Sequence, residues 1–145
     1  MRFHYPLQKI VDLKESEKSQ AEWRLSEAIG RLKEEESALD EWKNERKKWE
    51  DRFRDMCERG ASVADLIAIE QHLDYVDRQI SAQMLQVAKA KNRVDSRKKK
   101  LKHKMIDAKI WNTAKEKARL QFLQEYARKE QGELDDLVST RFART

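Results

Sequence analysis

Apolar side chains recur at alternating spacings of three and four residues along two long stretches of the chain. The first stripe contains Leu25, Ala28, Leu32, Leu39, Trp42, Trp49, Phe53 and Met56. The second contains Leu66, Ile69, Leu73, Val76, Ile80, Val87, Ala90, Val94, Leu101, Ala108 and Trp111. Polar interruptions are few, and they are Glu35, Arg46, Gln83, Arg97 and Lys104. A sustained seven-residue repeat keeps one face of a helix towards a partner helix, so each stretch is predicted to be one helix of a coiled coil.

One turn signal separates the two stripes. Gly60 can adopt the left-handed conformation that ends a helix, and Ser62 can cap the next helix with Asp65 three residues further on. Pro6 suits the first turn of a helix. A short turn between two long helices makes them antiparallel. We therefore predict an all-α antiparallel coiled-coil hairpin, a single domain over 1–145, with helices over about 6–58 and 63–138 and the turn at 57–62.

The second predicted helix is longer than the first. Folding about Gly60 sets Phe53 near Ala68 and Leu7 near Ala114, so roughly 25 residues of the second helix overhang. Near residue 118 the apolar stripe changes phase and continues as Leu120, Leu123, Ala127, Leu134 and Leu137. An apolar face without an intramolecular partner is either a frayed tail or a segment that docks into another protein, and the pattern leaves both open.

Composition agrees with long helices. Charged residues make up 41% of the chain, and there are three glycines and one proline, too few for a globule with many turns. Cys57 is the single cysteine, so no intrachain disulfide can form and a reducing cytosol is expected. No apolar run reaches the length of a membrane span, and residues 1–13 lack the continuous apolar core of a signal peptide. We expect a soluble, cytoplasmic protein.

No arrangement of residues predicts catalysis. His4, His72 and His103 are far apart in the sequence and have no cysteine or carboxylate at metal-ligand spacing. The chain also lacks a glycine-rich phosphate loop and a nucleophile elbow. We therefore expect no enzymatic activity, no metal, no cofactor and no small-molecule substrate.

Residues 89–104 form the strongest charge feature, with nine basic residues and the single acid Asp95. Pairing with acids on the opposite helix is the favoured explanation, and these acids are Glu15, Glu17, Glu22 and Glu27. An acidic protein partner is the second explanation. Nucleic acid or an anionic membrane is the third, and the sequence disfavours it because no interleaved aromatics accompany the run.

Four tryptophans are many for a thin hairpin. Trp42, Trp49 and Trp111 lie on the apolar stripes, but an indole is too large to be covered by two helices, so part of each ring should stay exposed. Exposed aromatic surface is typical of binding hot spots, but packing in the seam is the favoured explanation of these positions.

The N-terminal residues Phe3-His4-Tyr5-Pro6-Leu7-Gln8-Lys9-Ile10-Val11-Asp12-Leu13-Lys14-Glu15 resemble the opening of the FliJ family of flagellar export proteins. The likeness continues through Lys18, Ala21, Glu22 and Leu25. It returns at the turn (59–62), in Ile69-Glu70-Gln71, and in 133–136 with Arg141 and Phe142. The resemblance thus extends over nearly the whole chain in order and register.

The resemblance implies a non-enzymatic, cytoplasmic stalk protein of the type III export apparatus, attached to the membrane only indirectly through the export gate. Its expected partners are the export ATPase ring, the cytoplasmic domain of the export gate, and export chaperones. Carried onto this chain, the gate contacts are Trp42, Glu45, Trp49, His72, Val76, Gln79 and Gln83. The ATPase contacts are expected at the open end, at Phe3, Leu7, Ile10, Leu13, Phe122, Leu123, Tyr126, Leu134 and Leu137. An injectisome stalk, or a nucleic-acid- or membrane-binding coiled coil that uses residues 89–104, remains the alternative.

Overall fold

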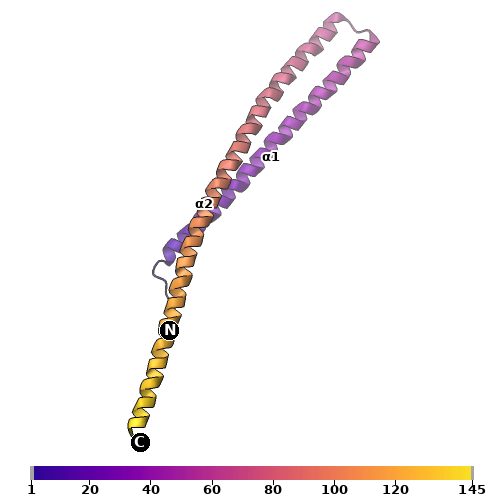
Figure 1. The fold of residues 1–145 in the computed structure, drawn as a ribbon. Coiled ribbons are helices and arrows are strands. Elements are labelled where there is room, and N and C mark those ends of the chain that lie inside the picture. Colours follow the sequence, from indigo (N-terminus) through magenta and orange to yellow (C-terminus); the bar gives the residue numbers. More distant parts are fainter. Residues whose placement is uncertain (1, 145) are drawn as a thin grey trace. The chain divides into compact units, whose positions relative to one another are not determined.

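Two helices make up the part of the chain that the structure, a computed structural model, describes, residues 2–144. They are α1 (Gln8–Arg59) and α2 (Val63–Arg144), packed against each other (Figure 1), and no strand occurs within residues 2–144. The all-α prediction of two long helices is therefore confirmed. The observed bounds differ at the ends, because α1 begins at Gln8 and α2 continues beyond residue 138 to Arg144.

Contacts between residues divide the chain into two units. The hairpin unit comprises residues 21–101, and the terminal unit comprises residues 1–20 and 102–145, of which 2–20 and 102–144 are described. Each unit contains a stretch of α1 and a stretch of α2. A single domain over the whole chain stays a prediction.

The turn of the hairpin unit has the chemistry that the sequence predicts. Gly60 adopts a φ of 77°, which side chains with a Cβ rarely adopt. The Ala61 amide then donates to the Met56 carbonyl at 3.1 Å, the hydrogen bond of a glycine-ended helix in the Schellman form. On the other side, the Ser62 hydroxyl accepts a hydrogen bond from the Asp65 amide at 3.2 Å and so caps α2. The left-handed Gly60 and these two hydrogen bonds fix where one helix ends and the next begins.

The buried seam of the hairpin unit is built from small and β-branched side chains. Val76 is fully buried, and the other buried residues of this unit are Ala28, Ile69, Val87, Ala90 and Val94. All six belong to the two stripes predicted from the sequence. Larger side chains such as Trp42 and Trp49 stay half-exposed, since two helices cannot cover an indole completely.

Polar residues that interrupt the stripes bind one another across the seam of the hairpin unit. The Gln83 amide donates to the Glu35 carbonyl oxygen at 2.9 Å and also to the Glu35 carboxylate. The Arg46 guanidinium pairs with Asp77. These contacts join residues that face each other when the chain folds about Gly60, so they support the predicted antiparallel register. They also satisfy groups that would otherwise be half-buried without a partner.

The terminal unit has a smaller seam, in which Val11 and Ala108 are buried. Lys14 pairs with Asp107 at 2.9 Å, and this hydrogen bond raises the pKa of the Lys14 ammonium. Asn112 donates a hydrogen bond to Glu15 at 2.6 Å. The terminal unit is thus held more by polar contacts than by apolar burial. Across residues 2–144, neither helix contains a stretch that is long and apolar enough to cross a membrane.

Candidate functional site

Four aromatic rings gather on one side of the hairpin unit. Trp49 lies edge-on to His72 with ring centroids 4.5 Å apart, and Trp42 lies edge-on to Tyr75 at 6.2 Å. His72 and Tyr75 stack at 6.0 Å, so α2 contributes two rings and α1 two. We call Trp42, Trp49, His72 and Tyr75 the aromatic cluster. Edge-on and offset arrangements of this kind are the favourable ones for aromatic pairs.

A carboxylate and a shallow groove accompany the aromatic cluster. The Trp49 indole N–H donates to Glu45 Oε1 at 2.8 Å, which orients the ring. The groove has a volume of about 450 Å³ and is lined by Trp42, Glu45, His72 and Tyr75 together with Glu41. His72 Nε2 is buried and has no hydrogen-bond partner among the described residues. The surface therefore combines apolar rings with acidic hydrogen-bond acceptors, a composition suited to binding a protein.

The structure brings together only some of the residues that the resemblance assigns to gate binding. Trp42, Glu45, Trp49 and His72 share the aromatic cluster and its rim. Val76 is 0% exposed and packs in the seam, where it supports the neighbouring rings but offers no surface. The remaining two residues are Gln79, which is half-buried, and Gln83, whose amide is bound to Glu35.

Sequence reasoning missed Tyr75. The residue is 45% exposed and contacts two members of the aromatic cluster. It lies three positions after His72, on the same face of α2, and that helical spacing was the available signal.

A second group of aromatic residues lies in the terminal unit, where the segment before α1 packs on α2. Phe3 contacts Phe122 with ring centroids 5.4 Å apart and Tyr5 at 6.3 Å. Phe122 in turn stacks with Tyr126 at 6.4 Å. The Glu130 carboxylate accepts a hydrogen bond from the Tyr126 hydroxyl and raises the pKa of Tyr126. Three of the residues predicted to bind the ATPase thus form a continuous row of ring contacts, Phe3, Phe122 and Tyr126.

The other residues predicted to bind the ATPase line exposed surface of the terminal unit. Every residue from 123 to 144 is exposed, including large apolar side chains. The predicted ones are Leu123 (45% exposed), Leu134 (56%) and Leu137 (64%) on α2, together with Leu7 (43%) and Leu13 (54%). Ile10 is half-buried. An apolar face of this extent on a helix is typical of a segment that binds another protein.

Pairing across the seam, the favoured explanation for residues 89–104, is wrong for most of the run. Among the described residues only Lys104 pairs with a predicted acid, Glu17, at 3.2 Å. Glu15 instead pairs with Lys18 on its own helix. The other eight basic residues form no ion pair with any residue in 2–144. A continuous run winds around the whole helix, so only a minority of its side chains can face α1.

Residues 2–144 contain no group of three or more His, Cys, Asp or Glu residues placed to hold a metal ion. Cys57 is exposed and free. Aromatic rings, exposed leucines and unpaired basic residues are the features of the surface that suit binding to another molecule.

Comparison with known proteins gives one family. The family model described as flagellar FliJ protein matches residues 3–145. Among solved structures, a YscO homolog from Chlamydia trachomatis is 24% identical in sequence, with 94% of this chain and 93% of that chain covered and a TM-score of 0.45. Comparison with curated proteins gives no match.

Proposed function

The chain belongs to the flagellar FliJ protein family, and we propose that it acts as a coiled-coil stalk that binds both the export ATPase ring and the export gate. Membership of this family supports a structural role as a component of the flagellar type III export apparatus. The observation that carries the proposal is the family match over residues 3–145, nearly the entire chain. A match to a flagellar family also favours the flagellum over an injectisome.

Gate binding is assigned to the aromatic cluster. Trp42, Trp49, His72 and Tyr75 offer a rigid, partly exposed apolar surface, and Glu41 and Glu45 at its rim can accept hydrogen bonds. Aromatic side chains in such a position supply much of the free energy at protein interfaces. The partner we propose for this surface is the cytoplasmic domain of the export gate.

Replacing Trp42 and Trp49 together by leucine tests gate binding, because leucine keeps an apolar side chain at the seam. We expect the affinity for the purified cytoplasmic domain of the cognate export gate to fall by about 2 kcal/mol or more, measured by titration calorimetry. Trp111→Leu is the matched control, since Trp111 is also a half-buried tryptophan of an apolar stripe and lies outside the aromatic cluster. Unchanged affinity in the double variant, or an equal loss in the control, contradicts the assignment.

ATPase binding is assigned to the exposed leucine face of the terminal unit, which we define as Leu123, Leu134 and Leu137. These side chains are about half-exposed or more and have no seam to fill within the described chain. A partner that covers them gains apolar burial of about 25 cal/mol for each Å². The partner we propose is the ring of the export ATPase, with the aromatic contact of Phe3 and Phe122 at the edge of the interface.

Serine at Leu134 and Leu137 tests ATPase binding without touching the seam. We expect stimulation of the cognate ATPase to fall several-fold while the far-ultraviolet circular dichroism of the hairpin stays unchanged. Serine at Lys129 and Gln131, which are exposed in the same segment, is the matched control. Unchanged stimulation of the ATPase by the protein with Leu134→Ser and Leu137→Ser would falsify docking through the exposed leucine face.

Localisation and chaperone cycling complete the proposal. A protein that binds the gate and the ATPase works in the cytoplasm at the base of the flagellum, at the inner face of the cell membrane, with membrane association only through the gate. Export chaperones are proposed as transient partners on the same stalk.

A further inference from the structure

Arg97 differs from the other polar residues that interrupt the apolar stripes, because it has no hydrogen-bond or ion-pair partner among the described residues. Glu35 and Gln83 bind each other, and Arg46 and Lys104 each pair with an acid. Arg97 is half-buried, and no ion pair or hydrogen bond joins its guanidinium to any residue in 2–144. A partly desolvated charge without a partner is unfavourable. An anionic group from outside the chain would remove that cost.

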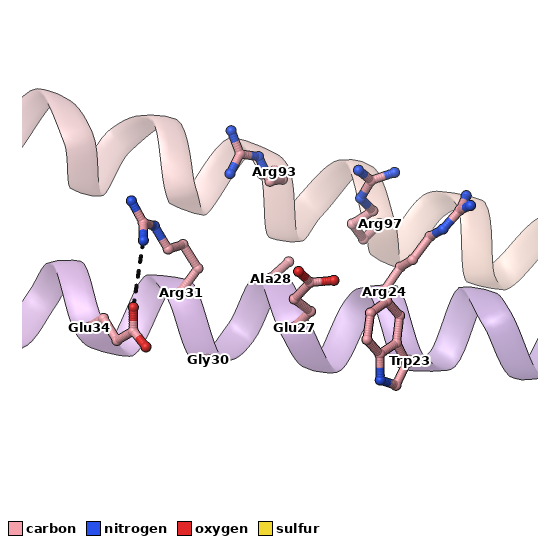
Figure 2. A pocket seen from close by; sticks show the side chains of 9 residues that line it. All are labelled: Trp23, Arg24, Glu27, Ala28, Gly30, Arg31, Glu34, Arg93 and Arg97. Carbon is pink, nitrogen blue, oxygen red and sulfur yellow. Dashed lines mark ion pairs between the residues drawn. The ribbon is translucent and has the colours of Figure 1, made fainter.

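Arg97 lines a groove of about 740 Å³ between α1 and α2, within the hairpin unit, which we call the arginine groove. Figure 2 shows Arg93 and Arg97 on α2, Arg24 reaching from α1 towards α2, and Trp23 on α1. Grooves of this volume accommodate several side chains and not merely a single ion.

The groove carries an excess of unpaired positive charge. Arg24, Arg93 and Arg97 have no ion pair with any described residue, whereas Arg31 is bound by Glu34 at 3.7 Å and by Glu35 at 3.2 Å. Glu27 also lines the groove and is likewise unpaired. Three free guanidinium groups therefore meet one free carboxylate, and pairing with Glu27 could neutralise only one of them.

Gly30 lines the groove and has no side chain to occupy it. It lies in the interior of α1, where glycine weakens a helix relative to alanine. A Cβ added at Gly30 meets nothing within 4 Å, so packing against α2 does not require a glycine at this position. What the glycine provides is empty space beside the arginines. Trp23, 67% exposed, adds an uncovered apolar surface to the same groove.

We propose that this groove binds an acidic segment of a partner protein. Arg93 and Arg97 are one helical turn apart on α2, so their guanidinium forks can each bind a carboxylate of a segment whose acids are also one turn apart. Trp23 receives an apolar side chain of that segment. This binding site is separate from the aromatic cluster and from the exposed leucine face, and it stands whether or not those surfaces bind the gate and the ATPase.

Charge and shape favour a protein over a nucleic acid or a membrane. The free carboxylate of Glu27 lies in the groove, and it is less compatible with the continuous row of phosphates of a nucleic-acid backbone than with a peptide whose few acids are a helical turn apart. The groove has one aromatic residue, Trp23, whereas single-stranded nucleic acids are held by several stacked rings. A flat lipid surface would contact the exposed lysines of the run, such as Lys98 and Lys99, more readily than the half-buried Arg97.

The test measures binding of a short, fluorescein-labelled helical peptide, with glutamates one turn apart and one phenylalanine, to the full-length protein by fluorescence anisotropy. At about 0.15 M salt, where exposed charges are largely screened, we expect binding that a glutamine analogue of the peptide lacks. Arg93→Gln with Arg97→Gln should weaken it about tenfold or more. Lys98→Gln with Lys99→Gln, the matched control, removes the same charge outside the groove and should weaken it far less. Equal losses in the two variants would overturn the proposal, because they indicate diffuse attraction.

Two further variants separate groove shape from charge. Gly30→Leu fills the groove without changing its charge and should abolish peptide binding, whereas Ser26→Leu, on the exposed surface of the same helix, should not. Circular dichroism confirms that each variant folds. Oligothymidylate and vesicles of phosphatidylserine are titrated in parallel. The proposal is overturned if the acidic peptide does not bind. It is also overturned if oligothymidylate or the vesicles bind more tightly than the peptide and this binding depends on Arg93 and Arg97.

Discussion

At the scale of single residues, glycine has opposite effects at two positions of α1 and its turn. Gly60 adopts a φ of 77° that makes the Ala61–Met56 hydrogen bond possible. Gly30 has ordinary helical geometry and open space around it. The same chemical change, addition of a methyl group, therefore strains the backbone at one position and only restricts the unfolded chain at the other.

Gly30→Ala is expected to stabilise the protein by about 0.5–1 kcal/mol, and Gly60→Ala to destabilise it by about 1–2 kcal/mol. Alanine favours the helix at residue 30, but its Cβ clashes with the left-handed conformation at residue 60. Urea unfolding followed by circular dichroism measures both. Gly132→Ala, also helical and open, is the internal control for the first value. A loss of stability on Gly30→Ala would show that α2 approaches this position more closely than the open space indicates.

His72→Phe is expected to raise the free energy of unfolding by about 1 kcal/mol, because it removes a buried nitrogen that has no hydrogen-bond partner. Phenylalanine keeps the ring that packs on Trp49. Tyr75→Phe, at an exposed position of the same cluster, should change stability by less than about 0.5 kcal/mol. A destabilising effect of His72→Phe would contradict this prediction. It would indicate that the Nε2–H group of His72 donates a weak hydrogen bond to the face of the Trp49 indole.

At the scale of the helices, the sequence predicted what depends on local chemistry and repeat. Gly60 and Ser62 predicted the position of the turn, and the two apolar stripes predicted the residues that are buried in the seam. Helix α2 continues through Gly132 to Arg144, because the neighbours of Gly132 are strong helix formers and Gln131 bonds to Asp135 along the helix. The arginine groove was not predictable, since it depends on which side chains fail to find a partner in the folded register. The aromatic cluster was half predictable, from Trp42 and Trp49 but without Tyr75.

Backbone amides beyond Tyr126 should exchange with solvent much faster than those of the hairpin unit. Residues 127–144 are helical but exposed throughout, and a helix without tertiary burial is only marginally stable. Hydrogen exchange with mass spectrometry on the isolated protein measures the difference, with residues 87–94, which include three buried side chains, as the internal reference. Equal protection in both segments would mean that the tail is already covered in solution, for example by a second copy of the chain.

At the scale of the whole molecule, the proposed binding surfaces belong to different units. The aromatic cluster and the arginine groove lie in the hairpin unit, and the exposed leucine face lies in the terminal unit. None of the residues of one surface contacts a residue of another in an observed pair. Substitutions in surfaces without shared contacts usually act additively. A stalk that binds two partners at once requires this independence.

The final prediction is that gate binding and ATPase stimulation can be lost separately. Trp42→Leu with Trp49→Leu should weaken gate binding and leave ATPase stimulation within about a factor of two, whereas Leu134→Ser with Leu137→Ser should do the opposite. Combining the four substitutions should give the sum of the two free-energy losses to within about 0.5 kcal/mol. Each variant is assayed with the purified gate domain, with the purified ATPase, and for swimming of cells that carry it as their only copy. Impairment of both activities by either pair of substitutions, with the helices intact, would mean that one partner contacts both surfaces. That result would contradict the assignment of gate binding to the hairpin unit and of ATPase binding to the terminal unit.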